Sequence, residues 1–203
     1  MKYFTGDIFA DNAMMIEILQ ESTLYNGTNR KKKYKEFKGK YPNSKQISAT
    51  YGYTRRGKMS ETKCRKESIY FGFYQTQTMS HNEHLEAIFA EYALYHLPED
   101  FFYSQVQINF NYDIEPHYDS QNQKDSYIVG FGDYTGGNLA IKLEKGVASI
   151  DIKDKPMKFN GSKHMHWVEP HKGDRWSLVF FTHYSEKEMK DLADKKMFLN
   201  YNK

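Results

Sequence analysis

The sequence is poor in the features that mark secreted and membrane proteins. It has one cysteine, Cys64, so no disulfide can form within the chain, which fits a reducing compartment. No apolar run approaches the roughly 18 residues of a membrane span. The first residues carry Asp7 and Asp11 where a secretory signal has an apolar core. We therefore expect an intracellular protein, cytoplasmic or nuclear, with no membrane attachment and no disulfide partner.

Internal repeats and low-complexity linkers are also missing. A chain of 203 residues is typical of one domain with a full core, so we expect a single domain over 1–203. Aromatic residues are plentiful instead, with 17 Tyr, 14 Phe and 2 Trp. Large rings therefore supply much of the apolar surface that the core can bury.

The net charge is only +3, but it is unevenly placed along the chain. Residues 30–66 hold 14 of the 29 Lys and Arg and two acids, so this segment carries +12 and the remainder −9. Basic groups contact phosphates and aromatic rings stack on bases. One interpretation is therefore a segment that binds nucleic acid, DNA more than RNA, and the other is a solvated basic loop. The candidate substrate contacts within it are Tyr51, Tyr53, Arg55 and Arg56.

Helical patterns come first in the chain and strand patterns follow. Apolar residues recur at helical spacing in 8–22 and 81–97, and runs at 46–54 and 68–75 have strand character. From residue 103 the chain reads as short strands separated by Gly-containing turns. The expected strands are 103–112, 126–132, 138–143, 147–151, 165–169 and 174–183, with a closing helix at 185–196. This order predicts an α+β fold, an antiparallel sandwich of 103–183 that residues 1–100 buttress with helices.

His117 and Asp119 are the first candidate metal ligands. They stand two residues apart, so on a strand their side chains point to the same side. Two His and one carboxylate can occupy three positions of an octahedral Fe(II) and leave the others open. The third ligand is then His164, His166 or His171. We favour His166, because a hairpin over 165–183 brings it near the next strand, and His164 remains the alternative.

Zinc is the competing metal for such a site. Structural zinc sites prefer four ligands, commonly cysteines, and this chain has one cysteine. A catalytic zinc could use two His and one Asp, but the sequence has no zincin helix motif. Fe(II) is therefore the better prediction.

Arg175 and Ser177 form the second half of the pattern. On a strand they share one face, with Trp176 and Leu178 on the other. Both faces of this strand are expected to be largely apolar and covered. A buried Arg is costly unless an anion meets it, and a guanidinium binds carboxylates well. A bound dicarboxylate at Arg175 is the simplest interpretation.

The motifs together resemble the Fe(II)/2-oxoglutarate dioxygenase superfamily. The resemblance covers roughly 103–183 and rests on His117-x-Asp119, the opening Gly136-Gly137-Asn138-Leu139 and the run from Phe159 to Phe181. Within the superfamily, the spacing from His166 to Arg175 and the run Gly173-x-Arg-x-Ser-Leu-Val-Phe are most similar to the TET/JBP group, which oxidises the 5-methyl of pyrimidines in nucleic acid.

This resemblance implies a double-stranded β-helix, or jelly roll, with Fe(II) held by His117, Asp119 and His166. It implies that Arg175 binds the distal carboxylate of 2-oxoglutarate with Ser177 beside it, and that O₂ is the third cofactor. Asn109 and Asn111 correspond loosely to the Asn-x-Tyr with which AlkB relatives contact 2-oxoglutarate. The second position is Asn here, which puts its role in doubt.

The substrate is open at this level. The first hypothesis is a dioxygenase of 5-methylcytosine or thymine in nucleic acid, in which a ring such as Tyr118 stacks on the base. The second is a hydroxylase of a protein, peptide or small metabolite, and an AlkB-like N-demethylase is a further variant. A binding module with a vestigial metal site is the alternative in which no reaction occurs.

Overall fold

The computed structural model describes residues 2–22, 24, 46–52, 54–55, 73–74, 79–80, 83–112, 114–185 and 187. Outside these ranges lie Tyr53, Arg56, Cys64, most of the basic segment and most of the helix expected at 185–196. Arg55 is described by its backbone alone, in strand β2 (Thr54–Arg55), which pairs with β3 (Phe73–Tyr74). The role of the basic segment therefore stays a prediction.

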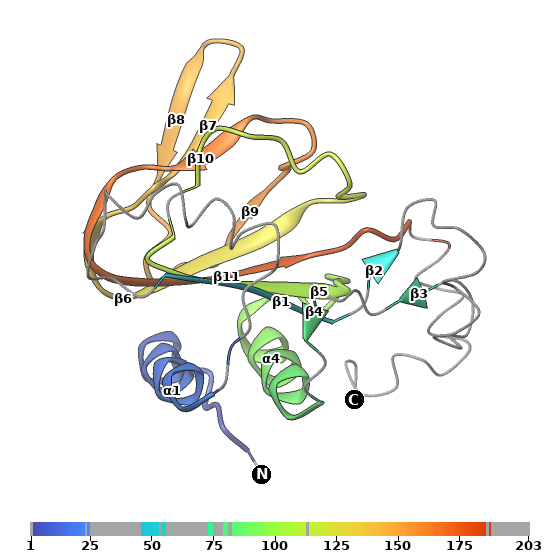
Figure 1. The fold of residues 1–203 in the computed structure, drawn as a ribbon, viewed down its shortest axis with the longest axis vertical. Coiled ribbons are helices and arrows are strands. Elements are labelled where there is room, and N and C mark those ends of the chain that lie inside the picture. The colour runs from blue at the N-terminus through green and yellow to red at the C-terminus, as the bar shows by residue number, and fades with distance from the viewer. Residues whose placement is uncertain are drawn as a thin grey trace.

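A six-stranded sheet forms the larger layer (Figure 1). Its order is β4 (Met79–Ser80), β1 (Ile47–Gly52), β5 (Gln105–Phe110), β11 (His171–Phe181), β6 (Ser126–Gly136) and β9 (Met157–Phe159). Neighbouring strands are antiparallel except β1 and β4, which are parallel. The smaller sheet has the order β10 (His166–Val168), β7 (Leu139–Leu143) and β8 (Gly146–Ile150).

The chain passes back and forth between these two sheets. Strands β5 and β6 belong to the larger sheet, β7 and β8 to the smaller, β9 to the larger, β10 to the smaller and β11 to the larger. The strands thus wind around a common interior, which is the double-stranded β-helix, or jelly roll. The fold predicted from the sequence is confirmed.

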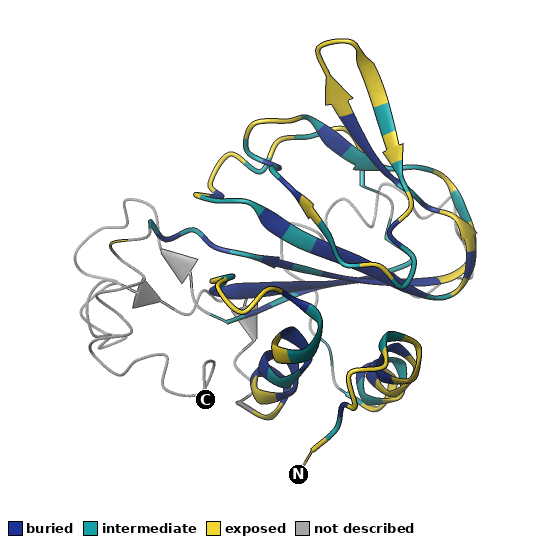
Figure 2. Ribbon diagram, turned by 180° about the vertical axis from the view of Figure 1, so that it is seen from behind, coloured by how far each residue is buried: buried dark blue, intermediate teal, exposed yellow. Residues whose placement is uncertain are grey.

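Two helices cover the outer face of the larger sheet (Figures 1 and 2). Helix α1 (Ile8–Glu21) begins at Asp7, whose carboxylate accepts hydrogen bonds from the backbone N–H groups of Phe9 and Ala10, as an N-cap does. Helix α4 spans Glu83–His96. The expected buttressing by helices is therefore confirmed. Among the described residues, no helix is long and apolar enough to span a membrane.

The two faces of the larger sheet differ in chemistry. Trp176, Leu178 and Phe180 of β11 pack into the core beneath the helices. The opposite side, called here the inner face, is turned toward the smaller sheet, since Val179 packs there with the cluster of Leu139 and Ile141. The buried polar residues of this inner face include Ser48, Gln105, Gln107, Asn109, Ser126, Arg175 and Ser177. The prediction that both faces are largely apolar is wrong for this face, although both are covered.

Strand lengths differ from the sequence prediction. Strands β6 and β11 are each 11 residues long and pair along most of their length, from His171 opposite Gly136 to Phe180 opposite Tyr127. Strand β9, which no pattern predicted, has three residues after Pro156. A strand this short shows too little alternation to be seen in the sequence. Long pairing of β6 with β11 is what places Arg175 deep inside the fold.

Candidate metal centre and anion site

Backbone pairing holds His117 and His166 directly opposite each other. The two residues form an antiparallel β-bridge, with His117 N–H donating to the His166 carbonyl and His166 N–H donating to the His117 carbonyl, both at 3.0 Å. Their ring centroids lie 4.3 Å apart. Two residues separated by almost 50 positions are thus fixed by paired hydrogen bonds, which sets both imidazoles on one side of the bridge.

Each of the two imidazole rings is oriented by a contact between its own Nδ1 and a backbone carbonyl. His117 Nδ1 lies 2.7 Å from the Glu115 carbonyl, and His166 Nδ1 lies 3.1 Å from the His164 carbonyl. A carbonyl can only accept a hydrogen bond, so each Nδ1 carries the proton. Each Nε2 is therefore the nitrogen that would bind a metal through its lone pair, as in metal-bound histidines whose other nitrogen donates to a carbonyl. Without a metal, a protonated Nε2 donates to the carboxylate beside it.

Asp119 faces both of these nitrogens. Its Oδ1 lies 3.5 Å from His117 Nε2, and its Oδ2 lies 3.5 Å from His166 Nε2. Burial alone raises the pKa of Asp119, but the hydrogen bonds and charge interactions with the two imidazoles outweigh it and hold that pKa well below its usual value. The carboxylate is therefore ionised. One ligand atom from each of the three residues falls within 4.8 Å of the others.

The other candidate histidines lie apart from this cluster. His164 is exposed, and its backbone carbonyl, not its ring, serves the centre by accepting from His166. His171 is half-buried at the start of β11, opposite Gly136, with its ring centroid 6.4 Å from that of Tyr134. The structure thus brings together His117, Asp119 and His166, the trio favoured from the sequence.

Gly161 supports the centre in a way that sequence reasoning missed. Its carbonyl accepts from the Asp119 backbone N–H at 2.9 Å. A Cβ at this position would lie 2.8 Å from Asp119 Oδ2 and 2.8 Å from His166 Cε1. In the sequence Asn160-Gly161 indicates a turn, but the pattern cannot show that the turn presses against two ligands.

We expect Gly161→Ala to weaken divalent-metal affinity by roughly 10- to 100-fold, the range seen when groups that orient ligands are disturbed. The cause is displacement of the Asp119 carboxylate and the His166 ring by the new methyl group. Anaerobic titration with Fe(II), or aerobic titration with Mn(II), measures the effect.

Gly146→Ala is the matched control for this prediction. Nothing lies within 4 Å of a Cβ at Gly146, but its φ of +136° is strained for alanine. The control should lower thermal stability and leave metal affinity unchanged. Equal metal affinity in both variants would show that Gly161 does not shape the centre.

Arg175 is the largest buried polar side chain on the inner face. It is 1% exposed, and its Nε donates to the Gly137 carbonyl at 3.1 Å. Its two Nη atoms are buried without a hydrogen-bond partner in the part of the chain described. Burial lowers the pKa of this guanidinium, while the phenol of Tyr134 acts in the opposite direction. A buried cation whose two Nη groups lack partners is costly, so this arrangement predicts an anion that binds both of them.

Tyr134 is a second polar group at this position that the sequence did not reveal. The Arg175 Cζ lies 5.6 Å from the centroid of its ring, and its buried hydroxyl likewise has no partner among the described residues. Burial raises the pKa of Tyr134, so the phenol stays protonated and able to donate. Gly137 gives the guanidinium room, since a Cβ there would lie 2.8 Å from Arg175 Nε.

Asn109 and Asn111 have different surroundings. Asn109 is buried on the inner face, and its Nδ2 donates to Ser177 Oγ at 3.4 Å. Asn111 follows the end of β5 with a φ of +46°, accepts from the Arg175 backbone N–H at 2.7 Å and donates to Asp174 at 3.0 Å. The two ends of the Asn111 amide are thus occupied by Asp174 and Arg175 of β11, which leaves Asn109 as the better candidate for a contact with the anion.

Tyr118 and Tyr51 differ sharply in exposure. Tyr118 is 51% exposed although both of its neighbours in sequence belong to the metal cluster. Tyr51 is 1% exposed and packs against Phe89 in the core on the helix side of the sheet. The prediction that Tyr51 stacks on a substrate is therefore wrong, because the sheet separates its ring from the metal cluster.

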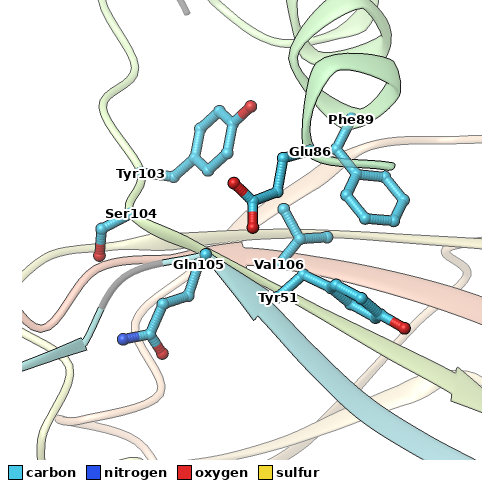
Figure 3. A pocket seen from close by; sticks show the side chains of 8 residues that line it. Tyr51, Glu86, Phe89, Tyr103, Ser104, Gln105 and Val106 are labelled. Atoms are coloured by element: carbon cyan, nitrogen blue, oxygen red, sulfur yellow. The ribbon is translucent and has the colours of Figure 1, made fainter. Parts of the chain in front are cut away.

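A hollow between α4 and the larger sheet is separate from this site (Figure 3). Glu86 and Tyr103 line it together with Tyr51 and Phe89. Burial, and then the nearby Glu86 carboxylate, raise the pKa of Tyr103. Figure 3 shows the Gln105 side chain on the other side of the sheet from Glu86, as strand alternation requires. The hollow therefore lies outside the jelly-roll interior that holds Arg175.

Comparison with known proteins gives matches among solved structures. No protein-family model and no curated protein matches the sequence. An oxidoreductase of the 2OG-Fe(II) oxygenase family from Burkholderia pseudomallei is 20% identical over 46% of this chain and 49% of its own, with a TM-score of 0.36. A prolyl hydroxylase from Trichoplax adhaerens, solved with a hypoxia inducible factor peptide, is 14% identical over 46% and 48%, with a TM-score of 0.35.

A third structure matches over more of the chain. NgTET1 in complex with 5mC DNA is 13% identical over 84% of this chain and 77% of its own, with a TM-score of 0.44. For the first two structures, the match spans about half of their length. One of the three was solved with a peptide and another with DNA, so the comparisons leave the substrate of this chain open.

Proposed function

We propose that this protein is a dioxygenase that uses Fe(II), 2-oxoglutarate and O₂. The observation that carries the proposal is the pairing of two sites in one jelly roll. The cluster of His117, Asp119 and His166 offers three metal ligands within 4.8 Å, and the buried Arg175 presents two Nη groups without partners. A metal with open positions and an anion receptor inside the same jelly roll together fit a cosubstrate that chelates the metal and has a second carboxylate.

The residues present fit Fe(II). Two neutral imidazoles and one ionised carboxylate from three residues suit Fe(II) and leave three positions for other ligands. Asp119 is held by its backbone N–H bond to Gly161 at 2.9 Å, and Asn122 Nδ2 lies 3.4 Å from its Oδ2. These contacts orient the carboxylate before the metal arrives. His117, Asp119 and His166 are the residues that would hold the metal.

The residues also fit 2-oxoglutarate. Arg175 would bind the distal carboxylate, Tyr134 would donate a second hydrogen bond and Ser177 a third. All three side chains come from the paired strands β6 and β11. An anion there satisfies the polar groups that are otherwise buried without partners.

Bound Fe(II), 2-oxoglutarate and O₂ together supply the oxidation of a C–H bond, with release of succinate and carbon dioxide. The chain itself supplies placement and seclusion. His117 and His166 present Nε2 because carbonyls hold both Nδ1–H groups, and Asp119 stays ionised. Tyr118, between two members of the metal cluster, is half-exposed and so available to a substrate that approaches the centre.

For the substrate, we infer the 5-methyl group of a pyrimidine in nucleic acid, 5-methylcytosine or thymine. Support comes from the run that resembles the TET/JBP group, from the +12 charge of residues 30–66 and from an exposed ring, Tyr118, between two members of the metal cluster. A base in a duplex must be flipped out, or lie in a single strand, to reach such a centre. An exposed ring at the mouth can stack on it.

A substrate screen tests this function. Protein loaded with Fe(II) under anaerobic conditions is mixed with 2-oxoglutarate and O₂ and with oligonucleotides that carry 5-methylcytosine, thymine or unmodified cytosine and uracil. We expect methylated oligonucleotides to stimulate succinate release and to yield an oxidised base by mass spectrometry. Peptides and small metabolites form the parallel arm. Stimulation by these alone would replace the nucleic-acid assignment with a hydroxylase of that class, and no turnover with any 2-oxo acid would leave a binding module.

Tyr134→Phe tests the anion site more finely. We expect 2-oxoglutarate to bind roughly 10- to 150-fold more weakly, since one hydrogen bond to a charged group contributes about 1.5–3 kcal/mol. Metal affinity should not change, because Tyr134 is not among the residues of the metal cluster. The measurement is an anaerobic titration of the Fe(II)-loaded protein with 2-oxoglutarate. Unchanged affinity would mean that the phenol does not touch the cosubstrate.

A further inference from the structure

We propose that a row of buried amides and hydroxyls orients Asn109 so that the hydroxyl of Ser177 faces the anion site as a hydrogen-bond donor. The row consists of Gln107, Ser48, Asn109 and Ser177, each at most 7% exposed. It rests on the proposed function, in which Arg175 and Ser177 hold the distal carboxylate of 2-oxoglutarate. Gln107 and Ser48 are thereby positioning residues, which act through Asn109 and not by contact.

A backbone carbonyl oxygen sets which groups donate and which accept along this row of hydrogen bonds. Gln107 Nε2 lies 3.0 Å from the Ile108 carbonyl oxygen. Because a carbonyl oxygen only accepts, the end of the Gln107 amide at this position must be the NH₂ group. Thr50 agrees with this orientation, since its hydroxyl donates to the other end, Gln107 Oε1. The Gln107 amide therefore has one permitted orientation of the two that its shape allows.

The orientation of Gln107 then fixes Asn109. Gln107 Nε2 also lies 3.0 Å from Ser48 Oγ and 3.3 Å from Asn109 Oδ1. Ser48 Oγ accepts from Gln107, so its own hydrogen is directed to Asn109 Oδ1 at 2.9 Å. The Ser48 hydroxyl is thus the donor to this end of the Asn109 side chain, and the longer Gln107 contact shares a hydrogen with a closer acceptor. That end must be the oxygen, and the NH₂ group is turned to the opposite side.

Ser177 receives this NH₂ group. Asn109 Nδ2 lies 3.4 Å from Ser177 Oγ, and the two residues are directly opposite each other on β5 and β11. With an acceptor lone pair of Ser177 used by Asn109, the hydroxyl hydrogen points elsewhere. Arg175 is two residues away on the same face of β11, so the hydroxyl can donate to an anion held there. A reversed Asn109 would instead draw the Ser177 hydrogen to its own oxygen and remove it from the anion.

The test is a double-mutant cycle on cosubstrate affinity with Gln107→Leu and Ser177→Ala. Gln107→Leu removes the donor that directs the Ser48 hydroxyl toward Asn109, and we expect it to weaken 2-oxoglutarate binding by at least about 10-fold, the loss of one hydrogen bond to a charged group. Ser177→Ala should cost a similar factor. The double variant should bind no more weakly than Ser177→Ala alone, because Gln107 acts through the Ser177 hydroxyl.

A second 2-oxo acid separates positioning from general damage. 2-Oxobutyrate lacks the distal carboxylate, so its affinity should be the same in Gln107→Leu and in the unchanged protein.

Gln105→Leu is the matched control, because Gln105 is a buried glutamine on the same strand whose amide contacts His183 at 3.2 Å. It should leave the affinity for 2-oxoglutarate unchanged. If Gln107→Leu does not fold, Ser48→Ala removes the hydroxyl that donates to Asn109 Oδ1 and should weaken 2-oxoglutarate binding by roughly two- to fivefold.

The outcomes divide clearly. Additive losses in the cycle, or equal losses for both 2-oxo acids, would overturn the positioning role of Gln107. Binding of 2-oxoglutarate that also survives Arg175→Met would instead show that the anion site itself is wrongly assigned, which is a failure of the proposed function. Non-additive losses confined to 2-oxoglutarate support the row.

Discussion

Replacement of Asp119 by alanine is expected to lower Fe(II) affinity by more than about 100-fold, above the range for disturbed supporting groups, and to abolish turnover. The variant removes the single negative charge that faces both Nε2 atoms. Without it, two neutral imidazoles remain, and two ligands of this kind bind Fe(II) weakly. The measurements are an anaerobic Fe(II) titration and succinate release in the presence of 2-oxoglutarate and O₂.

His164 and His166 provide a matched pair for the same prediction. His166→Ala removes a ring that is 7% exposed and faces Asp119, and we expect a loss like that of Asp119→Ala. His164→Ala keeps the backbone carbonyl that accepts from His166 Nδ1, so metal affinity and turnover should be retained. Loss of metal by His164→Ala with retention by His166→Ala would reverse the assignment of the third ligand.

The fold could be predicted from the sequence because its signals are local. Residues 8–22 have an apolar stripe at helical spacing, and from residue 103 short strand patterns alternate with turns that contain glycine. What could not be predicted is chemistry that depends on pairing across the sheet. Ser48 and Asn109 are 61 residues apart, and only the register of β1 against β5 places their side chains in contact.

Some residues of the candidate site could likewise be predicted from the sequence, and others could not. His117 and Asp119 are visible because their spacing alone puts them on one side of a strand. The sequence favoured His166 over His164 through the expected hairpin over 165–183, although the two have the same parity, and the β-bridge with His117 shows which of them joins the cluster. Tyr134 and Gly161 carry no local signal, because their roles come from Arg175 and Asp119 across the fold. Tyr51 was misplaced because an aromatic strand residue has no sequence mark for the face it occupies.

Arg175→Met is expected to have opposite effects on binding and on stability. Binding of 2-oxoglutarate should weaken by about 100-fold or more, since a bidentate guanidinium contact to a carboxylate is lost. Stability without ligand should rise by about 1–3 kcal/mol, because an apolar side chain of similar length replaces a buried cation whose Nη groups lack partners. A purely structural arginine would show the reverse, with a loss of stability on replacement.

Thermal or denaturant unfolding with and without 2-oxoglutarate measures both effects in one experiment. In the Fe(II)-loaded protein, ligand at 100 times its dissociation constant should add about 2.7 kcal/mol to the free energy of unfolding, and Arg175→Met should abolish that increment. Lys145, exposed in the turn between β7 and β8, provides the control substitution Lys145→Met, which should change neither quantity. A lower unliganded stability for Arg175→Met together with an unchanged ligand increment would contradict the anion site. The predicted result would show that the fold accepts a destabilising cation in its interior because the cosubstrate requires it.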